Sequence, residues 1–219
     1  MQQAFVVMIG GAAPHPGVMT RLPDDRIVIA ADSGLDHARA LGLHVDLVVG
    51  DLDSVSASGL AAAEAEGVPV ERHPSAKDAI DTELALEAAL VRGAGRIVVV
   101  TGGGDRLDHV LGGLFVLAHP MLRDVVVEAW VGPAYLRALQ GPGRAELEGP
   151  AGTYVSLLPI HGTADGVTTA GLRYPLHAES LDAGSSRGVS NEFLGGAACV
   201  SVQRGALLVV IPHALGGAS

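Results

Sequence analysis

Two acidic residues stand directly after a short apolar run, and their types and spacing are the strongest chemical signal in this sequence. The segment Gly50-Asp51-Leu52-Asp53-Ser54 follows Leu47-Val48-Val49. A strand that ends in this way can present both carboxylates at the edge of a sheet. Mg²⁺ prefers oxygen ligands and usually takes one or two carboxylates together with substrate phosphates. The segment therefore predicts metal-assisted chemistry on a phosphate compound.

Further polar segments follow other predicted strands or precede a predicted helix. They are Asp32-Ser33-Gly34, Lys77-Asp78-Ala79-Ile80-Asp81 and Thr101-Gly102-Gly103-Gly104-Asp105-Arg106-Leu107-Asp108-His109. Ligands of open parallel sheets bind beyond the carboxyl ends of the strands, so these segments are expected to converge. Asp51, Asp53, Asp78 and Asp81 are then the carboxylates available to Mg²⁺. The glycines would let a phosphate approach the backbone, near the positive end of the following helix.

Each segment also has a structural interpretation that involves no ligand. Asp53 or Ser54 could cap the next helix, and Asp32 could hold a local turn. Asp81 could be the N-cap of a helix that begins at Thr82, and Ser75-Ala76-Lys77-Asp78 fits a capping box. Taken singly, each segment favours this interpretation. Only their convergence favours a site.

The elements that must position these segments alternate along the first part of the chain. Apolar runs at 5–9, 27–31, 47–49, 97–100 and 125–127 predict buried strands. Segments with helical periodicity lie between them, at 35–41, 57–66, 82–91 and 107–118. This alternation predicts an α/β domain over residues 1–132, with a Rossmann-like, mostly parallel sheet covered on both faces.

The pattern changes after about Gly132. Helical periodicity disappears, and short apolar runs at 154–158, 198–202 and 207–211 are separated by turn residues. Residues 133–219 are therefore expected to form a smaller all-β domain. The boundary is expected between 131 and 152, where Gly-Pro pairs begin at Gly132, Gly141 and Gly149.

Composition narrows the class of protein. The chain has 219 residues, of which 48% are hydrophobic and 17% charged, as in ordered globular proteins. A formal net charge of −10 with scattered basic residues argues against a nucleic-acid partner. The single cysteine, Cys199, cannot form an intramolecular disulfide. No apolar segment is long enough to cross a bilayer, so a cytoplasmic location with no membrane partner is expected.

In order and spacing, these motifs resemble those of the thiamine pyrophosphokinase family. The first part carries the resemblance in Ala31-Asp32-Ser33-Gly34, Gly50-Asp51-Leu52-Asp53-Ser54, residues 77–86 and Arg106-Leu107-Asp108-His109. The second part carries it in Ser156-Leu157-Leu158-Pro159, residues 166–176 and Val189-Ser190-Asn191-Glu192-Phe193. The resemblance thus covers nearly the whole chain.

The resemblance implies transfer of a pyrophosphoryl group from ATP to the hydroxyl group of thiamine, which yields thiamine diphosphate and AMP. It implies Mg²⁺ as cofactor and a β-sandwich as the second, thiamine-binding domain. It also implies a homodimer with active sites at the subunit interface.

The resemblance also assigns roles to residues. Asp51, Asp53 and Asp81, with Asp78, would hold Mg²⁺ and the phosphates. The nucleotide would be bound by Asp32, Gly34, Lys77, Gly102, Gly103, Arg106 and His109. The substrate side would comprise Asp78, Asp81 and Asp108, with Ser190 and Asn191 of the partner subunit against thiamine. The catalytic set is thus Asp51, Asp53, Asp81 and Asp108, and either Asp81 or Asp108 could accept the hydroxyl proton.

Two departures from the family pattern leave the acceptor open. Ile80 stands where many relatives have threonine. Eukaryotic relatives stack an aromatic residue on thiamine near the Ser-Asn motif, and in this sequence only Phe193 lies near the Ser190-Asn191 pair. A pyrophosphokinase acting on a hydroxymethyl-pterin or another small alcohol is one alternative. A nucleotide-sensing protein without turnover is the other.

Overall fold

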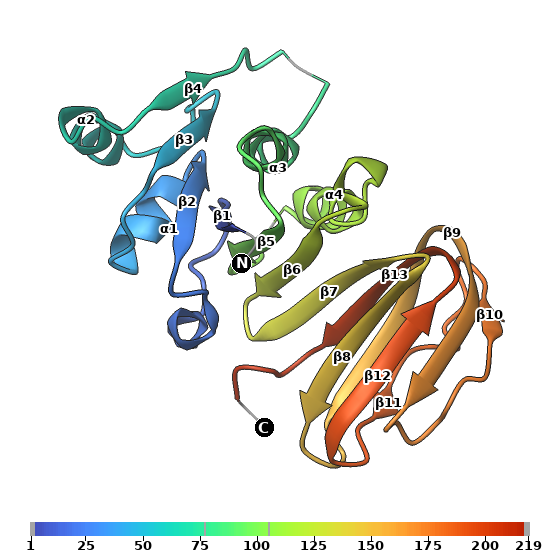
Figure 1. Cartoon of the computed structure of the whole chain (residues 1–219). Helices are drawn as coiled ribbons and strands as arrows, with labels where there is room; N and C mark the ends of the chain where they lie inside the picture. Colours follow the sequence, from blue (N-terminus) through green and yellow to red (C-terminus); the bar gives the residue numbers. More distant parts are fainter. Residues whose placement is uncertain (1–2, 77, 105, 217–219) are drawn as a thin grey trace. The chain divides into compact units, whose positions relative to one another are not determined.

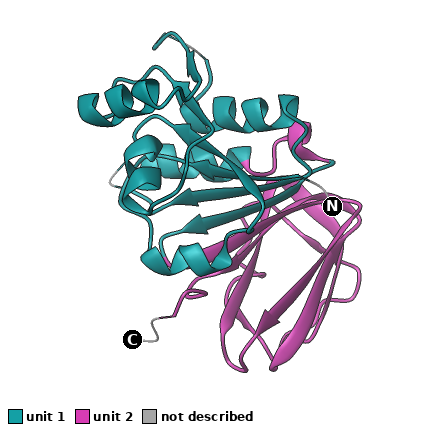
Figure 2. Ribbon diagram, turned by 60° about the vertical axis from the view of Figure 1, so that its left-hand side comes forward, with its two compact units in different colours: residues 1–116, 124–132 teal, residues 117–123, 133–219 magenta. Residues whose placement is uncertain are grey.

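The computed structural model describes residues 3–76, 78–104 and 106–216, and it divides the chain into two compact units. The first unit comprises Met1–Val116 and Asp124–Gly132, and the second comprises Leu117–Arg123 and Pro133–Ser219 (Figure 2). Residues 117–123, which the sequence analysis placed in the first domain, group with the second unit. There the Gln140 side chain donates a hydrogen bond to the His119 carbonyl, and Leu122 is buried.

The first unit is built on a parallel sheet with the strand order β4-β3-β2-β1-β5-β6 (Figure 1). Its strands are β1 (Ala4–Met8), β2 (Arg26–Ala31), β3 (Leu47–Gly50), β4 (Val70–Arg72), β5 (Arg96–Thr101) and β6 (Val126–Val131). The chain leaves β1 toward β2 on one side and later returns to β5 on its other side. The strand order therefore reverses at β1.

The helices of this unit form two pairs. They are α1 (Gly34–Ala40), α2 (Ala57–Ala65), α3 (Asp81–Val91) and α4 (Leu107–Val116), and a short 3-10 helix, η1 (Pro16–Arg21), follows β1. The predicted helices agree with these bounds within two residues. Helix α1 packs on β1, β2 and α2, whereas α3 packs on β1, β2, β3 and α4. Right-handed crossovers place the two pairs on opposite faces (Figure 1).

The strands of the first unit match the apolar runs because their residues are buried on both faces. Phe5, Met8, Ile29 and Ile97 are fully buried. Strand β4 was not predicted, since its three residues lie at the edge of the sheet and none of them is buried. An edge strand of this kind leaves almost no apolar pattern in the sequence.

The second unit is antiparallel throughout its described strand pairs. Its strands are β7 (Ala134–Gln140), β8 (Gly143–Gly149), β9 (Tyr154–Ala170), β10 (Glu179–Leu181), β11 (Asn191–Glu192), β12 (Gly196–Val202) and β13 (Arg204–Ile211). The first part of β9 pairs with β13, which also pairs with β7, and the last part of β9 pairs with β12, which also pairs with β8. Val155, Leu157, Phe193 and Val209 lie in the core of this unit.

The segment expected to contain the domain boundary is largely strand. Strands β7 and β8 occupy 134–140 and 143–149, and Gly141-Pro142 lies in the turn between them. Gly132-Pro133 separates β6 from β7, where one unit ends and the other begins. The Gly-Pro pairs therefore mark turns of strands and not a flexible linker.

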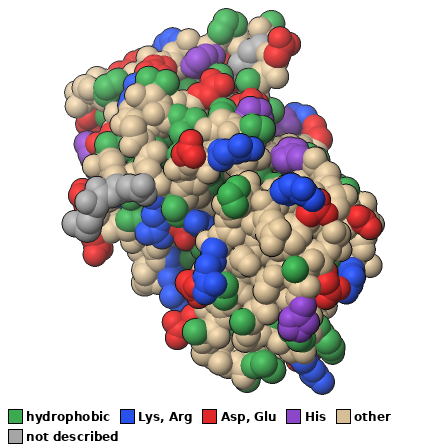
Figure 3. All heavy atoms as spheres, turned by 45° about the vertical axis from the view of Figure 1, so that its right-hand side comes forward, with side chains coloured by type: hydrophobic (Ala, Val, Ile, Leu, Met, Phe, Trp, Pro, Cys, Tyr) green, Lys and Arg blue, Asp and Glu red, His purple; other side chains and the backbone are tan. Residues whose placement is uncertain are grey.

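The described part of the chain contains no helix with both the length and the apolarity needed to span a membrane. On the face shown in Figure 3, acidic, basic and histidine side chains are interspersed.

Candidate active site

The carboxyl ends of β2 and β3 bring three acidic side chains together. Asp32 follows β2, and Asp51 and Asp53 follow β3, and one carboxylate oxygen of each lies within 4.8 Å of the others. The Asp32 amide donates to the Val49 carbonyl (3.0 Å), and the Leu52 amide donates to Asp32 Oδ1 (2.9 Å). These two bonds fasten the ends of the neighbouring strands together. The partner of the Asp32 carboxylate is twenty positions away in the chain, so its bond is not a local Asx turn.

The backbone around these acids adopts conformations that L-residues rarely take. Asp32 has φ 49° and Leu52 has φ 65°, both in the left-handed region. Such conformations are costly for non-glycine residues and cluster at functional sites. Leu52 is buried, whereas Asp51 is half-buried and Asp53 is exposed.

Gly50 lies at the centre of the acidic group. A Cβ atom at this position would lie 2.4 Å from Asp32 Oδ1 and 3.2 Å from Asp81 Oδ1, and the residue has φ 141°. Any side chain would therefore displace the carboxylates. The same distances show that Asp81, from the start of α3, joins the group formed by Asp32, Asp51 and Asp53.

The helix caps contradict the structural alternatives for these acids. The N-cap of α2 is Ser56, whose Oγ accepts from the Gly59 amide (3.0 Å), so neither Asp53 nor Ser54 caps that helix. The N-cap of α3 is Ile80, which makes no side-chain cap bond, so Asp81 lies one position inside the helix. The capping box expected at 75–78 is not at a helix start. Asp51, Asp53 and Asp81 are thus not held in place by capping a helix.

The acidic side chains beside Gly50 repel one another. The pKa of Asp32 is raised to about 7, first by burial and then by the charge of Asp81, a hydrogen bond with Asp81 and the charge of Asp51, although the Leu52 amide opposes the shift. Carboxylates packed this closely disfavour simultaneous ionisation. A divalent cation would offset the repulsion, and an all-carboxylate donor set suits Mg²⁺.

A glycine-rich loop follows β5 at the same edge of the sheet. Gly102 and Gly103 are half-buried and Gly104 is exposed. The loop packs on the segment after β1: the Ala12 amide donates to the Gly103 carbonyl (2.7 Å) and the Gly102 amide to the Ala12 carbonyl (3.1 Å). Two loops from adjacent strands therefore form one paired surface.

The first turn of α4 presents exposed charged residues. Arg106 donates from Nε and Nη2 to the two oxygens of Asp108 (3.2 and 2.5 Å). The hydrogen bond from Arg106 is the main cause that lowers the pKa of Asp108 to about 2. His109 is exposed beside this pair. Asp108 is therefore a stable carboxylate that orients Arg106.

Two of the other predicted nucleotide and substrate residues, Gly34 and Asp78, lie outside the acidic group. Gly34 is buried, and a Cβ atom there would lie 2.1 Å from the Met8 carbonyl oxygen, so its lack of a side chain serves the packing of α1 on β1. Asp78 is exposed and is not a member of the acidic group that includes Asp32. Lys77 lies outside the described residues.

In the second unit, Ser190 and Asn191 differ in their surroundings. Ser190 is exposed and has φ 59°, and its amide donates to Ser156 Oγ (3.1 Å). Asn191 is buried, with its Oδ1 accepting from the Tyr174 amide (3.0 Å) and its Nδ2 donating to the Tyr174 carbonyl (2.7 Å). Asn191 therefore fixes the backbone of Tyr174, whose side chain is exposed.

Comparisons with known proteins identify the family. The model of the thiamin pyrophosphokinase catalytic domain matches residues 20–128, and that of the vitamin B1 binding domain of the same enzyme matches residues 144–207. The chain belongs to the thiamin pyrophosphokinase family. It is accordingly an enzyme, and the predicted family is confirmed.

Individual members of the family agree with this assignment. The chain is 25% identical to thiamine pyrophosphokinase of Bacillus subtilis over 162 residues, which are 74% of this chain and 75% of the relative. It is 25% identical to the thiamin pyrophosphokinase structure from Geobacillus thermodenitrificans, with a TM-score of 0.80 over 95% of this chain and 96% of the other. The structure of the Bacillus subtilis enzyme shares the fold, with a TM-score of 0.82 and 22% identity over 95% and 98% of the two chains.

Several features of this family member escaped the sequence analysis. Asp32 was expected on the nucleotide side, yet it lies among the acids beside Gly50. The loop after β1 was not predicted to be part of the site, although Gly10-Gly11 directly after an apolar run is a signal for such a loop. Phe193 is only 1% exposed. It therefore belongs to the core of the second unit and cannot stack on a ligand at the surface.

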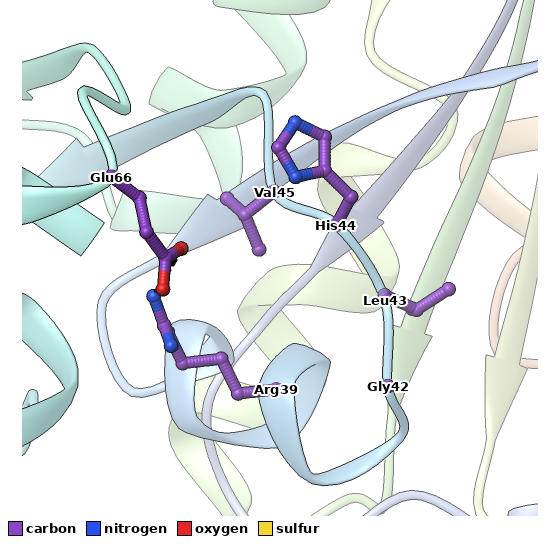
Figure 4. A pocket seen from close by; sticks show the side chains of 6 residues that line it. All are labelled: Arg39, Gly42, Leu43, His44, Val45 and Glu66. Carbon is purple, nitrogen blue, oxygen red and sulfur yellow. Dashed lines mark hydrogen bonds and ion pairs between the residues drawn. The ribbon is translucent and has the colours of Figure 1, made fainter. Parts of the chain in front are cut away.

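One hollow of about 340 Å³ lies away from the acidic group (Figure 4). Its lining residues are Arg39, Gly42, Leu43, His44, Val45 and Glu66, from the end of α1, the segment before β3 and the end of α2. Arg39 pairs with Glu66 at 2.7 Å. Because the segment before β3 lies at the amino end of that strand, this hollow is at the edge of the sheet opposite the acids.

Proposed function

We propose that this enzyme transfers a pyrophosphoryl group from ATP to the hydroxyl group of thiamine, giving thiamine diphosphate and AMP. The observation that carries the proposal is the convergence of Asp32, Asp51, Asp53 and Asp81 around Gly50 in a chain of this family. In the reaction, the thiamine hydroxyl oxygen bonds to the β-phosphorus, and the bond between that phosphorus and the oxygen bridging it to the α-phosphate breaks. The hydroxyl proton passes to a base, and AMP leaves.

We propose that Asp51, Asp53 and Asp81, together with Asp32, hold Mg²⁺. The close spacing of three of these acids and the raised pKa of Asp32 support an affinity for a divalent cation. When bound, Mg²⁺ supplies charge neutralisation and alignment for the transferring phosphates. The exposed position of Asp78, which precedes α3, supports a role at the substrate side for this residue.

We propose Asp81 as the proton acceptor in preference to Asp108. The pKa of Asp108, lowered to about 2 by Arg106, makes it a weak base at neutral pH. Asp81 lies beside Gly50 and interacts with Asp32. Asp108 is then a residue that positions Arg106, which would contact the phosphates with its guanidinium.

The nucleotide is proposed to bind to the first unit as to a Rossmann-like domain. The reversal of strand order at β1 supports this, since ligands of such sheets bind outside the carboxyl ends of the strands at that point. Gly102, Gly103, Arg106 and His109 lie after β5, beside β1. Lys77 remains a predicted contact.

Thiamine is proposed to bind to the second unit, taken as a β-sandwich. The match of the vitamin B1 binding domain to residues 144–207 supports this placement. The exposed Ser190 would contact the ligand, whereas Asn191, being buried, would act by holding Tyr174.

A homodimer with active sites at the interface is also proposed. Leu107, Leu111 and Phe115 recur every four residues on α4 and are 67%, 43% and 51% exposed. An apolar helical face of this kind is typical of a surface that another chain covers. Leu111→Glu is expected to convert the dimer to a monomer in size-exclusion chromatography with light scattering. A wild-type chain that is monomeric at micromolar concentration would contradict the proposal.

The direct test is product analysis. Purified protein with thiamine, ATP and MgCl₂ should form thiamine diphosphate and AMP in equal amounts, as detected by mass spectrometry. Thiamine monophosphate with ADP would contradict pyrophosphoryl transfer. Product formed from a hydroxymethyl-pterin and not from thiamine would contradict the acceptor.

A further inference from the structure

The loop after β1 is built into the edge of the sheet where the nucleotide is proposed to bind. Residues 11–13 are exposed, but their backbone is fixed by two bonds between Ala12 and the Gly102-Gly103 segment. A Cβ atom at Gly11 would lie 2.1 Å from the Gly103 carbonyl oxygen, and one at Gly102 would lie 2.2 Å from the Ala13 carbonyl oxygen. The contact therefore requires glycine on both sides. We refer to residues 10–13 and 102–104 together as the paired glycine loops.

Thr101, the last residue of β5, fastens the paired glycine loops to the sheet. Its side chain is buried (7% exposed), donates to the Gly10 carbonyl (2.9 Å) and accepts from the Gly103 amide (3.1 Å). One hydroxyl thus joins both loops. His37 of α1 adds a bond from Nε2 to the Gly11 carbonyl (2.9 Å). These bonds hold the two loops together and to the sheet without a ligand.

The paired glycine loops combine hydrogen-bonded carbonyls with backbone amides that have no partner among the described residues. The bonds described above use the carbonyls of Gly10, Gly11 and Gly103 inside the protein. Within the described part of the chain, the amides of Gly10 and Gly11 donate to no other group. Exposed backbone amides without a side chain nearby are a common means of binding phosphate.

The position of the paired glycine loops along the sheet indicates which part of the nucleotide they would bind. The strand order is β3-β2-β1-β5, and neighbouring strands lie about 4.8 Å apart. The acids after β3 are therefore on the order of 10–15 Å from the loops after β1 and β5. A nucleoside triphosphate whose β- and γ-phosphates lie at the acids would extend its nucleoside end toward the paired loops.

We propose that the paired glycine loops bind the nucleoside monophosphate half of the nucleotide, and that Thr101 is the residue that positions them. This rests on the proposed pyrophosphoryl transfer, in which that half leaves as AMP. The loops then hold the leaving group while the acids hold the transferred group. Binding of AMP should need neither Mg²⁺ nor the acids, because the paired glycine loops offer backbone groups and no carboxylate.

The experiment measures binding of AMP to the full chain by isothermal titration calorimetry in EDTA. Thr101→Val keeps the shape of the side chain and removes the hydroxyl with both of its hydrogen bonds to the loops, and it should weaken AMP binding by about threefold to tenfold. Gly11→Ala forces the Gly103 carbonyl to move and should weaken binding by more than about tenfold. Asp51→Asn should leave AMP binding unchanged or slightly stronger.

Matched controls separate this effect from general destabilisation. Gly93→Ala places a Cβ atom at another glycine with positive φ (+82°) where no atom lies within 4 Å. Thr169→Val removes another buried hydroxyl, one that accepts from the Leu176 amide (2.9 Å) in the second unit. Both should bind AMP as the wild type does, even where the melting temperature falls.

The outcomes distinguish this inference from the proposed function. Wild-type protein that forms thiamine diphosphate but does not bind AMP in EDTA would overturn the inference alone. So would Thr101→Val and Gly11→Ala variants that remain folded and bind AMP like the wild type. Absence of thiamine diphosphate formation by the wild type would instead overturn the proposed function.

Discussion

Two regions of the molecule differ in how their polar side chains are bonded. One is the carboxyl edge of the sheet in the first unit, which carries Asp32, Asp51 and Asp53 and is called the edge below. The other is the part of the second unit around Ser190 and Asn191, called the corner. At the edge, Asp32 meets other acids, and its pKa is raised to about 7 mainly by burial and by its neighbours. At the corner, the buried Asn191 accepts from and donates to the backbone of Tyr174. At the edge, a cation could relieve the repulsion between the carboxylates. At the corner, the polar groups of Asn191 already have hydrogen-bond partners within the protein.

The backbone is strained at both places, since Leu52 at the edge and Ser190 at the corner take left-handed conformations. Leu52 takes a left-handed conformation between Asp51 and Asp53 with no glycine to ease it. Strain that persists among like charges indicates a place kept for binding, because neither feature stabilises the fold. The buried side-chain amide of Asn191, with hydrogen bonds to the backbone of Tyr174, indicates a structural role. Substitutions at the two places should therefore have opposite consequences for activity and stability.

The largest effect is expected from the acids after β3. Asp51→Asn and Asp53→Asn should each lower the rate of AMP formation by about 100-fold or more, because charge stabilisation of the transferring phosphates is lost. The metal-free melting temperature should not fall, since repulsion is relieved. The rate is measured by coupled detection of AMP, with Asp25→Asn, an exposed acid before β2, as control. Unfolding of both variants would show that these acids serve the fold.

A large effect on stability is expected from the corner. Asn191→Ala leaves the amide and carbonyl of Tyr174 without these partners and should reduce the free energy of unfolding by about 1–3 kcal/mol. The KM for thiamine should rise because the loop of Tyr174 loosens. In Tyr174→Ala, the KM should rise at unchanged stability, since the ring is 57% exposed. Equal stability of Asn191→Ala and the wild type in urea melts would remove the contrast between the two regions.

A moderate effect is expected from pH. Because the pKa of Asp32 in the folded protein, about 7, lies above that of the unfolded chain, the folded state binds more protons between about pH 4 and 7. Metal-free protein should therefore lose the contribution of Asp32 to stability as the pH rises through this window. Asp32→Asn should show a smaller loss over the same range in thermal melts. Identical pH profiles would show that Asp32 is not strained by its neighbours.

Mg²⁺ provides a second readout of the same group. A bound cation favours the ionised carboxylates, so Mg²⁺ should raise the melting temperature of the wild type more at pH 8 than at pH 6. The variant Asp51→Asn should respond less at both values. A response to Mg²⁺ that is independent of pH would contradict binding at the acids beside Gly50.

The smallest effect is expected from the first turn of α4. Asp108→Asn should lower activity about tenfold by releasing Arg106, and it should leave stability unchanged because both side chains are exposed. The pH dependence of kcat should keep its acid limb. A loss of more than about 100-fold together with the acid limb would instead identify Asp108 as the proton acceptor.

Much of this molecule was accessible from local patterns. The bounds of α3 and α4 and the family itself were predicted, because buried runs and helical periodicity repeat at short range. Strand β4 was missed because it lies at an edge, and β7 and β8 were missed because Gly-Pro pairs around them suggested a boundary. The burial of Gly34 and Phe193 was not predicted, because it depends on elements distant in the sequence, Met8 for the glycine and the core of the second unit for the aromatic ring.

That Asp51 and Asp53 leave a buried strand with a glycine before them could be predicted from the sequence, since it depends only on the order of residues along one element. The sequence also determined the family, through motifs spread over both units. The convergence of Asp32 and Asp81 with these acids was expected, but the bond of Asp32 to Leu52 and the pairing of the loop after β1 with the glycines after β5 follow from tertiary contacts. Those contacts form across parallel neighbours, and the order of strands in a sheet is set by packing between distant segments and not by any one of them.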